Sequence, residues 1–145
     1  MALTQISEPL TIFLLGVTGD LSKKKILKAI YRLFEKKVLA SPFPLIGNAR
    51  TPLSREEFVT FVRSIVRPTD DSVWQAFAQC LHYVSGSTTE LATFSALQAL
   101  HHEVSRNDGC GNHMWYMATL PSLYIPIIQN LKKTHMQTSH CGWTK

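Results

Sequence analysis

The amino-acid sequence predicts an α/β fold in which helices flank a doubly wound parallel sheet. Three observations support this prediction: a continuous apolar run near the start of the chain, an amphipathic helical pattern directly after it, and the later alternation of short apolar segments with further helices. The chain has 145 residues, of which 45% are hydrophobic and 17% charged, enough apolar material for one globular domain. Residues 1–145 are therefore expected to form one domain.

The first predicted strand is the apolar run at residues 10–15, which ends at Gly16. An apolar run without polar alternation is typical of a strand buried on both faces of a parallel sheet. A helix is predicted next, because apolar residues from Leu21 to Phe34 recur at helical spacing. The lysine pair at 36–37 favours the carboxyl end of that helix through the helix dipole.

The rest of the chain repeats this alternation of strands and helices. Prolines before residue 45 and the capping-box spacing of Ser54 and Glu57 give two of the boundaries. The predicted elements are a strand at 45–47, a helix from Ser54 to Ile65, a helix from Thr69 or Asp70 to Cys80, a strand at 81–84, a helix from Thr89 to Leu100, a turn-rich loop at 106–112, a strand at 113–118, and a helix that Ser122 caps and whose apolar face is Ile125, Ile128 and Leu131.

Composition excludes several classes of function. No apolar run approaches the roughly 20 residues needed to cross a bilayer, so no membrane association is expected. The formal charge is +5, but lysine and arginine are spread along the chain and form no concentrated cationic face, so no nucleic-acid partner is expected. Three cysteines without a C-x-x-C pair do not describe a disulfide framework. A reducing, cytoplasmic location fits this usage best.

The cysteines and histidines between Cys110 and Cys141 could suggest a metal or nucleophile site. Their spacings match no zinc pattern, and no Ser/His/Asp arrangement lies at a predicted strand end. We expect no metal site, and we expect most of these side chains to lie at the surface or in loops.

A phosphate-binding turn is predicted where the first strand gives way to the first helix. Gly16 would permit the tight turn, Gly19 would let the backbone approach a ligand, and unpaired amides at the helix start would face anionic oxygens. Thr18 stands where a dinucleotide fingerprint has its middle glycine, so the pattern alone is weak. A strand-to-helix turn that merely needs glycine remains an alternative.

Lysines in the first turns of this helix favour the phosphate interpretation. Cations near a helix amino terminus oppose the helix dipole, which costs roughly 0.3–1 kcal/mol each, so Lys23, Lys24 and Lys25 call for nearby negative charge. Asp20 supplies part of it, and a bound phosphate could supply the rest. The alternative is that these lysines are simply solvated.

Residues 16–25, G-V-T-G-D-L-S-K-K-K, resemble the G-x-[ST]-G-D-L-[AS]-x-[RK]-K signature of glucose-6-phosphate dehydrogenases. The resemblance continues through I-G-N-A-R at 46–50, which is similar to the family's I-V-G-x-A-R, and through G-N-H-M-W-Y-M-A at 111–118 and P-S-L-Y at 121–124. It covers nearly the whole chain and implies an incomplete Rossmann-like domain with the first four or so strands. Leu120 departs from it, because the family usually has a proline there.

NADP is the cofactor that the resemblance and Arg50 imply. NADP sites avoid an acidic side chain after the second strand and supply an arginine for the 2′-phosphate, a role that Arg50 would fill. A solvated surface arginine is the alternative. For Lys25, the resemblance implies a contact with the substrate. The cofactor residues that it implies are Gly16, Val17, Thr18, Gly19, Asp20, Leu21, Ser22, Lys23 and Tyr124.

The resemblance also implies what the chain lacks. The family's catalytic residues are expected beyond Lys145, so glucose 6-phosphate would be a partner only if a second domain completed the site. The chain alone is then expected not to turn over, and self-association or pairing with a full-length enzyme is expected. A non-catalytic nucleotide-binding module is the alternative function.

Overall fold

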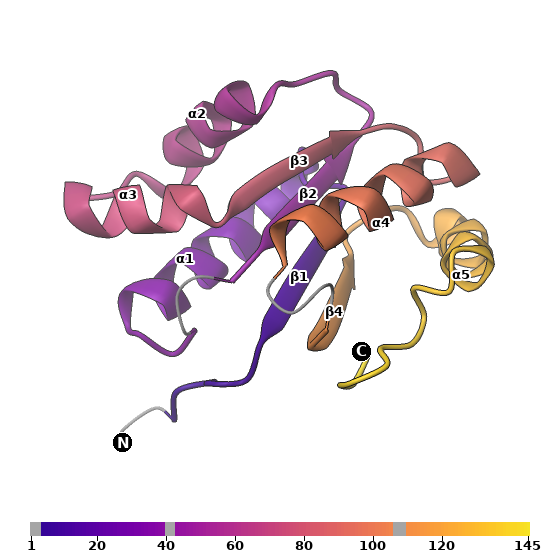
Figure 1. The fold of residues 1–145 in the computed structure, drawn as a ribbon. Coiled ribbons are helices and arrows are strands. Elements are labelled where there is room, and N and C mark those ends of the chain that lie inside the picture. The colour runs from indigo at the N-terminus through magenta and orange to yellow at the C-terminus, as the bar shows by residue number, and fades with distance from the viewer. Residues whose placement is uncertain (1–3, 40–42, 106–109) are drawn as a thin grey trace.

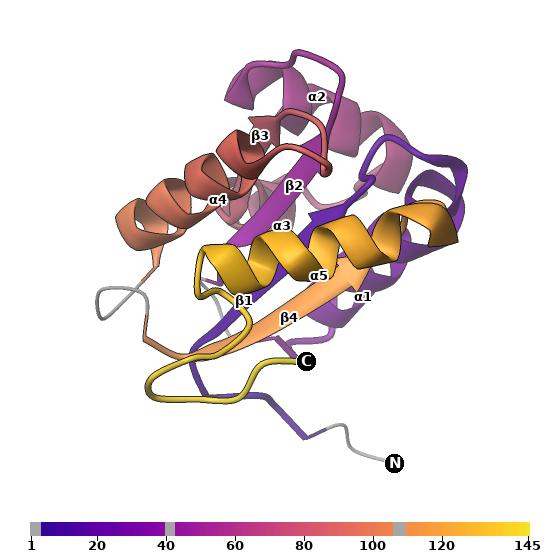
Figure 2. The same cartoon turned by 90° about the vertical axis from the view of Figure 1, so that its right-hand side faces the viewer.

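Residues 4–39, 43–105 and 110–145 are described by a computed structural model, in which four parallel strands form one sheet in the order β3-β2-β1-β4. Figures 1 and 2 show helices on both faces of this sheet, which makes three layers. The predicted doubly wound α/β fold is thereby confirmed. The strands are β1 Leu10–Leu15, β2 Leu45–Ala49, β3 Leu81–Ser85 and β4 Asn112–Met117.

β1 lies at the centre of the sheet and is buried along its whole length. It pairs with β2 on one side, where Phe13 is opposite Ile46, and with β4 on the other, where Phe13 is opposite Trp115. The chain therefore builds outward from β1 through β2 to β3 and then crosses to the opposite side for β4. In open α/β sheets, the carboxyl ends of strands at such a reversal form the usual ligand-binding crevice.

In the described residues, α1, α2 and α3 cover one face of the sheet, and the amino-terminal caps predicted for α2 and α3 are confirmed. The Oγ of Ser54 accepts a hydrogen bond from the amide of Glu57, whose carboxylate accepts one from the Ser54 amide in return. Asp70 caps the next helix through the amide of Ser72. The elements are a π-helical turn at Ser22–Ile26, α1 at Leu27–Glu35, α2 at Arg55–Val66 and α3 at Asp71–Gln79.

Two helices cover the opposite face: α4 at Leu91–Val104, and α5 at Tyr124–Lys133, which a 3₁₀ turn at Pro121–Leu123 precedes. The core beneath them centres on Phe13, which is fully buried and stacks on Trp115 with ring centroids 3.8 Å apart. Phe94 and other apolar side chains of α4 and α5 complete this cluster. Phe13 therefore packs β1 against both β4 and the helices of this layer.

A buried histidine lies at the edge of the same cluster. The Nε2 of His101 lies 3.2 Å from the Oγ1 of Thr11, and its ring contacts the ring edges of Phe13 and His113. Burial above all, followed by the charges of His113 and His102, lowers the pKa of His101 to about 4. His101 therefore remains neutral at pH 7 and acts as a packing residue.

The helical periodicity misplaced Leu21 and Leu33, which are 50% and 39% exposed rather than buried. For Leu21 the reason is the π-helical turn at Ser22–Ile26, which adds a residue to the first turn and so shifts the apolar face relative to α1.

The prediction for the last helix was wrong in two respects. Ser122 lies in the 3₁₀ turn and makes no cap, because α5 begins two residues later. Ile125 and Ile128 are 68% and 54% exposed, whereas Leu131 is buried as predicted and shares the buried face with Ile127. Apolar residues occur on two sides of this helix, so helical spacing alone could select either.

The expectation that the cysteines describe no disulfide framework is wrong for one pair, since Cys110 and Cys141 are joined. They meet because the chain returns after α5 to the beginning of β4, a tertiary contact that their separation of 31 residues does not reveal. Of the predicted loop at 106–112, residues 106–109 lie outside the described residues. Among the described residues, no helix is long and apolar enough to span a bilayer.

Candidate functional site

The glycine turn predicted from sequence lies at the reversal point of the sheet, directly after β1. Gly16 adopts a φ of 79°, in the left-handed region that favours glycine. The amides of Gly16 and Val17 both donate to the carbonyl of Asn48, at 2.8 and 3.0 Å, and the Gly19 amide donates back to the Gly16 carbonyl. The turn is therefore fixed to the end of β2 and is closed on itself.

Gly16 is also constrained by the strand on its other side. A Cβ atom added there would collide with the backbone carbonyl of Ala118 and would lie 3.1 Å from the Cγ2 of Thr119. The amide of Ala118 meanwhile donates to the carbonyl of Leu15, which holds the end of β4 against the turn. The tight turn after β1 can therefore pack against the end of β4 only because residue 16 has no side chain.

The helix that follows begins at Asp20 and presents its first amides toward the carboxyl edge of the sheet. Ser22 is fully buried, and its Oγ donates to the carbonyl of Gly16 at 2.9 Å, so the helix start is tied to the turn. Backbone donors at a helix start, held next to a glycine turn, are the usual arrangement for binding phosphate oxygens.

The positive charges of the lysines after Asp20 are only partly balanced by nearby negative charge. Lys23 and Lys24 lie 3.7 and 3.9 Å from the two carboxylate oxygens of Asp20, which is 78% exposed, and such exposed pairs contribute little to stability. Lys25 is exposed in the same turn. The positive potential at this helix start therefore remains available to an anion.

Arg50 directly follows β2 at the same edge of the sheet and is exposed. Two residues that the sequence pattern does not indicate, Asn48 and Tyr83, hold this region in place. Asn48 is fully buried and donates through Nδ2 to the carbonyls of Val84 and Gly86, while the hydroxyl of Tyr83 donates to the carbonyls of Ala49 and Thr51. The turn that carries Arg50 is thus held from both sides.

Tyr124 and Leu120 both follow the carboxyl end of β4 and are more exposed. Tyr124 is 37% exposed at the first position of α5, which follows the carboxyl end of β4. Leu120, the departure from the family pattern, is 70% exposed in the same connection. The structure therefore brings Gly16, Gly19 and Arg50 to one edge and leaves Tyr124 at its border. Among the described residues, no group of three histidine, cysteine or acidic side chains could hold a metal ion.

Comparison with known proteins supports the family resemblance over most of the chain. Residues 13–145 match the family model described as "Glucose-6-phosphate dehydrogenase, NAD binding domain". The chain is 32% identical over 132 residues to the glucose-6-phosphate 1-dehydrogenase of Emericella nidulans, covering 89% of this chain and 26% of that protein. It is 31% identical over 144 residues to the cytoplasmic isoform of Solanum tuberosum, covering 94% and 28%.

The fold agrees with a solved structure of a glucose-6-phosphate dehydrogenase in complex with its substrate glucose-6-phosphate. The two superpose with a TM-score of 0.83 at 25% sequence identity, covering 98% of this chain and 30% of the other. The chain thus spans between a quarter and a third of the length of the proteins it resembles.

Proposed function

The chain belongs to the glucose-6-phosphate dehydrogenase family, and from this premise we propose that residues 1–145 form the NADP-binding, Rossmann-like part of such an enzyme. The observation that carries the proposal is the glycine turn at 16–19, fixed between β2 and β4 at the reversal point of the sheet. The proposed cofactor contacts are Gly16, Val17, Thr18, Gly19, Asp20, Leu21, Ser22, Lys23, Arg50 and Tyr124.

The turn and the helix start are proposed to hold the pyrophosphate. Gly16 permits the tight turn against Ala118, Gly19 is proposed to let the backbone approach the ligand, and the first amides of the helix can donate to phosphate oxygens. Lys23 adds a positive charge that the exposed carboxylate of Asp20 balances only in part. When bound, the nicotinamide ring of the cofactor accepts a hydride. The proposed role of these residues is to bind and orient it.

Preference for NADP over NAD is proposed to depend on Arg50. A guanidinium can form two parallel charge-assisted hydrogen bonds with a phosphate, and no acidic side chain occupies the positions from Ala49 to Leu53 after β2, where an NAD site commonly has one. The hydrogen bonds from Tyr83 to Ala49 and Thr51 support this role, because they fix the backbone on both sides of Arg50.

Replacing Arg50 with alanine is expected to weaken NADP binding by roughly 10- to 100-fold, since hydrogen bonds to charged groups contribute about 1.5–3 kcal/mol. NAD binding should change by less than about threefold, because NAD lacks the 2′-phosphate. Isothermal titration calorimetry of both nucleotides would measure the two affinities.

Arg32→Ala is the matched control, because Arg32 is an exposed arginine on α1 and takes no part in the proposed site. It should leave both affinities unchanged. Equal loss of NADP and NAD binding in Arg50→Ala, or no loss of either, would contradict the proposed role of Arg50.

The substrate side of the site is proposed to need residues from outside this chain. Oxidation of glucose 6-phosphate requires a base for the hydroxyl proton, and we assign no residue of this chain to that role. Lys25, exposed near the glycine turn, is a candidate contact for the substrate phosphate. The chain alone is expected to show no glucose 6-phosphate-dependent formation of NADPH, and detectable turnover would overturn this.

A non-catalytic module or partner of a full-length enzyme is the second candidate, favoured by the same intact glycine turn. It predicts nucleotide affinity comparable to that of a complete enzyme, together with a stable complex on mixing the two. By the family assignment, we propose a cytoplasmic location.

Self-association is proposed through the outer side of α5 and the connection before it. Leu120, Ile125 and Ile128 are each more than half exposed there, and α5 lies on the outside of the molecule in Figure 2. Exposed apolar clusters of this kind often mark interaction surfaces. Ile125→Lys with Ile128→Lys should shift the protein toward monomer in sedimentation velocity.

Leu33→Lys is the matched control for this pair, because Leu33 is an exposed apolar residue of α1 on the opposite helical layer. It should leave the sedimentation profile unchanged. A monomeric wild-type chain at tens of micromolar would exclude self-association.

A further inference from the structure

The last residues of the chain lie along the outer edge of β4. The amide of His113 donates to the carbonyl of Trp143 at 2.8 Å, the Trp115 amide donates to the carbonyl of Lys145 at 2.7 Å, and the Lys145 amide donates to the carbonyl of His113. Thr144 and His113 form a parallel bridge. Residues 143–145 thus pair with the outer edge of β4, and we name residues 139–145 the clasp.

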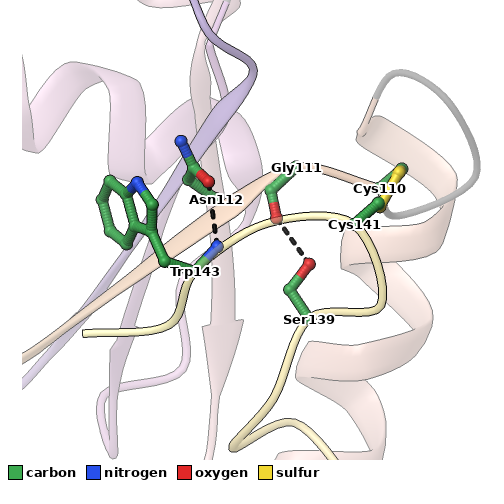
Figure 3. The surroundings of a disulfide bond; sticks show 6 residues. All are labelled: Cys110, Gly111, Asn112, Ser139, Cys141 and Trp143. Atoms are coloured by element: carbon green, nitrogen blue, oxygen red, sulfur yellow. Dashed lines mark hydrogen bonds between the residues drawn. A yellow bond between two sulfur atoms is a disulfide. The ribbon is translucent and has the colours of Figure 1, made fainter.

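Side chains at the start of β4 hold the clasp in register. Figure 3 shows the Oγ of Ser139 donating to the carbonyl of Gly111 at 2.6 Å, and the amide of Trp143 donating to the Oδ1 of Asn112 at 3.0 Å. The Nδ2 of Asn112 in turn donates to Glu8, ahead of β1. The clasp is therefore connected through Asn112 to the segment that precedes β1.

The approach of the clasp to β4 is close enough to require glycine. A Cβ atom on Gly142 would lie 2.5 Å from the carbonyl oxygen of Gly111 and 2.6 Å from the Oδ1 of Asn112. Both are oxygens of the segment that the clasp covers, so a side chain at position 142 would push the two apart. The contact is a specific, tight one.

A cysteine lies on each side of this contact. Cys110 precedes Gly111 and Cys141 precedes Gly142, and their Cα atoms are 5.6 Å apart, within the range that a disulfide spans without backbone movement. Cys141 is exposed and Cys110 partly exposed, whereas Cys80 is buried on the opposite side of the sheet. Small thiols and disulfides in solution can therefore reach Cys141.

We propose that Cys110 and Cys141 form a reversible thiol–disulfide exchange site that locks and unlocks the clasp on β4. The oxidant is a low-molecular-weight disulfide of the glutathione class. The Cys141 thiolate attacks one sulfur of that disulfide, forming a mixed disulfide and releasing one thiolate; Cys110 then attacks the Cys141 sulfur and releases the second. The two cysteine thiols lose two protons and two electrons, and the electrons reduce the small disulfide to two thiols.

Locking the clasp should stabilise the sheet edge at some distance from the nucleotide site. The clasp pairs with the first half of β4, whereas the glycine turn packs against Ala118, beyond its last residue. The disulfide also closes a loop that contains β4 and α5, which restricts the unfolded chain. Oxidation should therefore raise stability and protect the amides that the clasp covers.

The test uses the full 145-residue chain equilibrated with oxidised or reduced glutathione. The oxidised protein should lose two titratable thiols, melt about 10 °C higher than the reduced protein, and exchange the His113 and Trp115 amide hydrogens at least about tenfold more slowly. The paired variant Cys110→Ser with Cys141→Ser should show no response to either form of glutathione. Cys80→Ala should respond as the wild type does.

Two outcomes would overturn the proposal. One is a mass spectrum of the oxidised wild type in which Cys110 and Cys141 carry glutathione separately or remain reduced. The other is a Cys110–Cys141 disulfide that forms without any change in melting temperature or in amide exchange at β4. Because neither readout involves a nucleotide, either result can be distinguished from a failure of the proposed NADP site.

Discussion

Replacing Gly16 with alanine is expected to destabilise the protein by about 2–4 kcal/mol and to remove detectable nucleotide binding. The residue needs a φ of 79°, which costs an alanine about 1 kcal/mol or more, and the new methyl group would also collide with the carbonyl of Ala118. Relieving the collision requires β1 and β4 to separate where Ala118 donates to Leu15. Thermal melts and calorimetric titration with NADP would measure both effects.

Gly19→Ala is the informative comparison. Its added Cβ would lie 3.2 Å from the Gly16 carbonyl, a tight but tolerable contact, and no left-handed backbone angle is involved. We expect less than about 1 kcal/mol of destabilisation, with NADP binding reduced at least about tenfold if the backbone there approaches the phosphates. A Gly16→Ala protein as stable as the wild type would contradict the packing described here. Full binding by Gly19→Ala would contradict its role in the site.

Phe13→Ala is expected to cost about 3–5 kcal/mol of stability, a large part of the 5–15 kcal/mol typical of a domain. Phe13 is fully buried, stacks on Trp115 and contacts the rings of His101 and His113, so its removal leaves a cavity between β1, β4 and α4. The melting temperature should fall by more than about 10 °C.

Phe61→Ala makes the same chemical change at a partly exposed position of α2. It should cost clearly less than Phe13→Ala, on the order of 1 kcal/mol, because solvent fills most of the vacated space. Equal losses for the two variants, measured by urea denaturation, would show that the stacked aromatic cluster is not the centre of this core.

The elements that could be predicted from sequence are those that local physics determines. The run at 10–15, which is apolar except for Thr11, is best buried between two neighbouring strands, and the Ser54 capping box closes within one helical turn. The glycine turn could be predicted for the same reason, because a strand that ends in glycine directly before an amphipathic helix leaves room only for a tight turn. Arg50 could be placed at the same edge because parallel strands end together.

What could not be predicted depends on contacts between distant segments. The hydrogen bonds of Asn48 to Val84 and Gly86 join β2 to β3, and a buried asparagine in an apolar segment was the available signal. Ile125 and Ile127 are equally apolar, so only the packed sheet decides which one is buried. The Cys110–Cys141 pair likewise depends on the path of the chain after α5.

The account rests on binding of nucleotide phosphates at the turn between β1 and the first helix. A titration of the isotope-labelled chain with NADP, followed by amide NMR, tests this most directly. We expect saturable shifts at the amides of residues 16–23 and at Arg50, and little change near the end of α3, which leads into the amino end of β3. Shifts confined to other parts of the chain, or none at millimolar NADP, would contradict it.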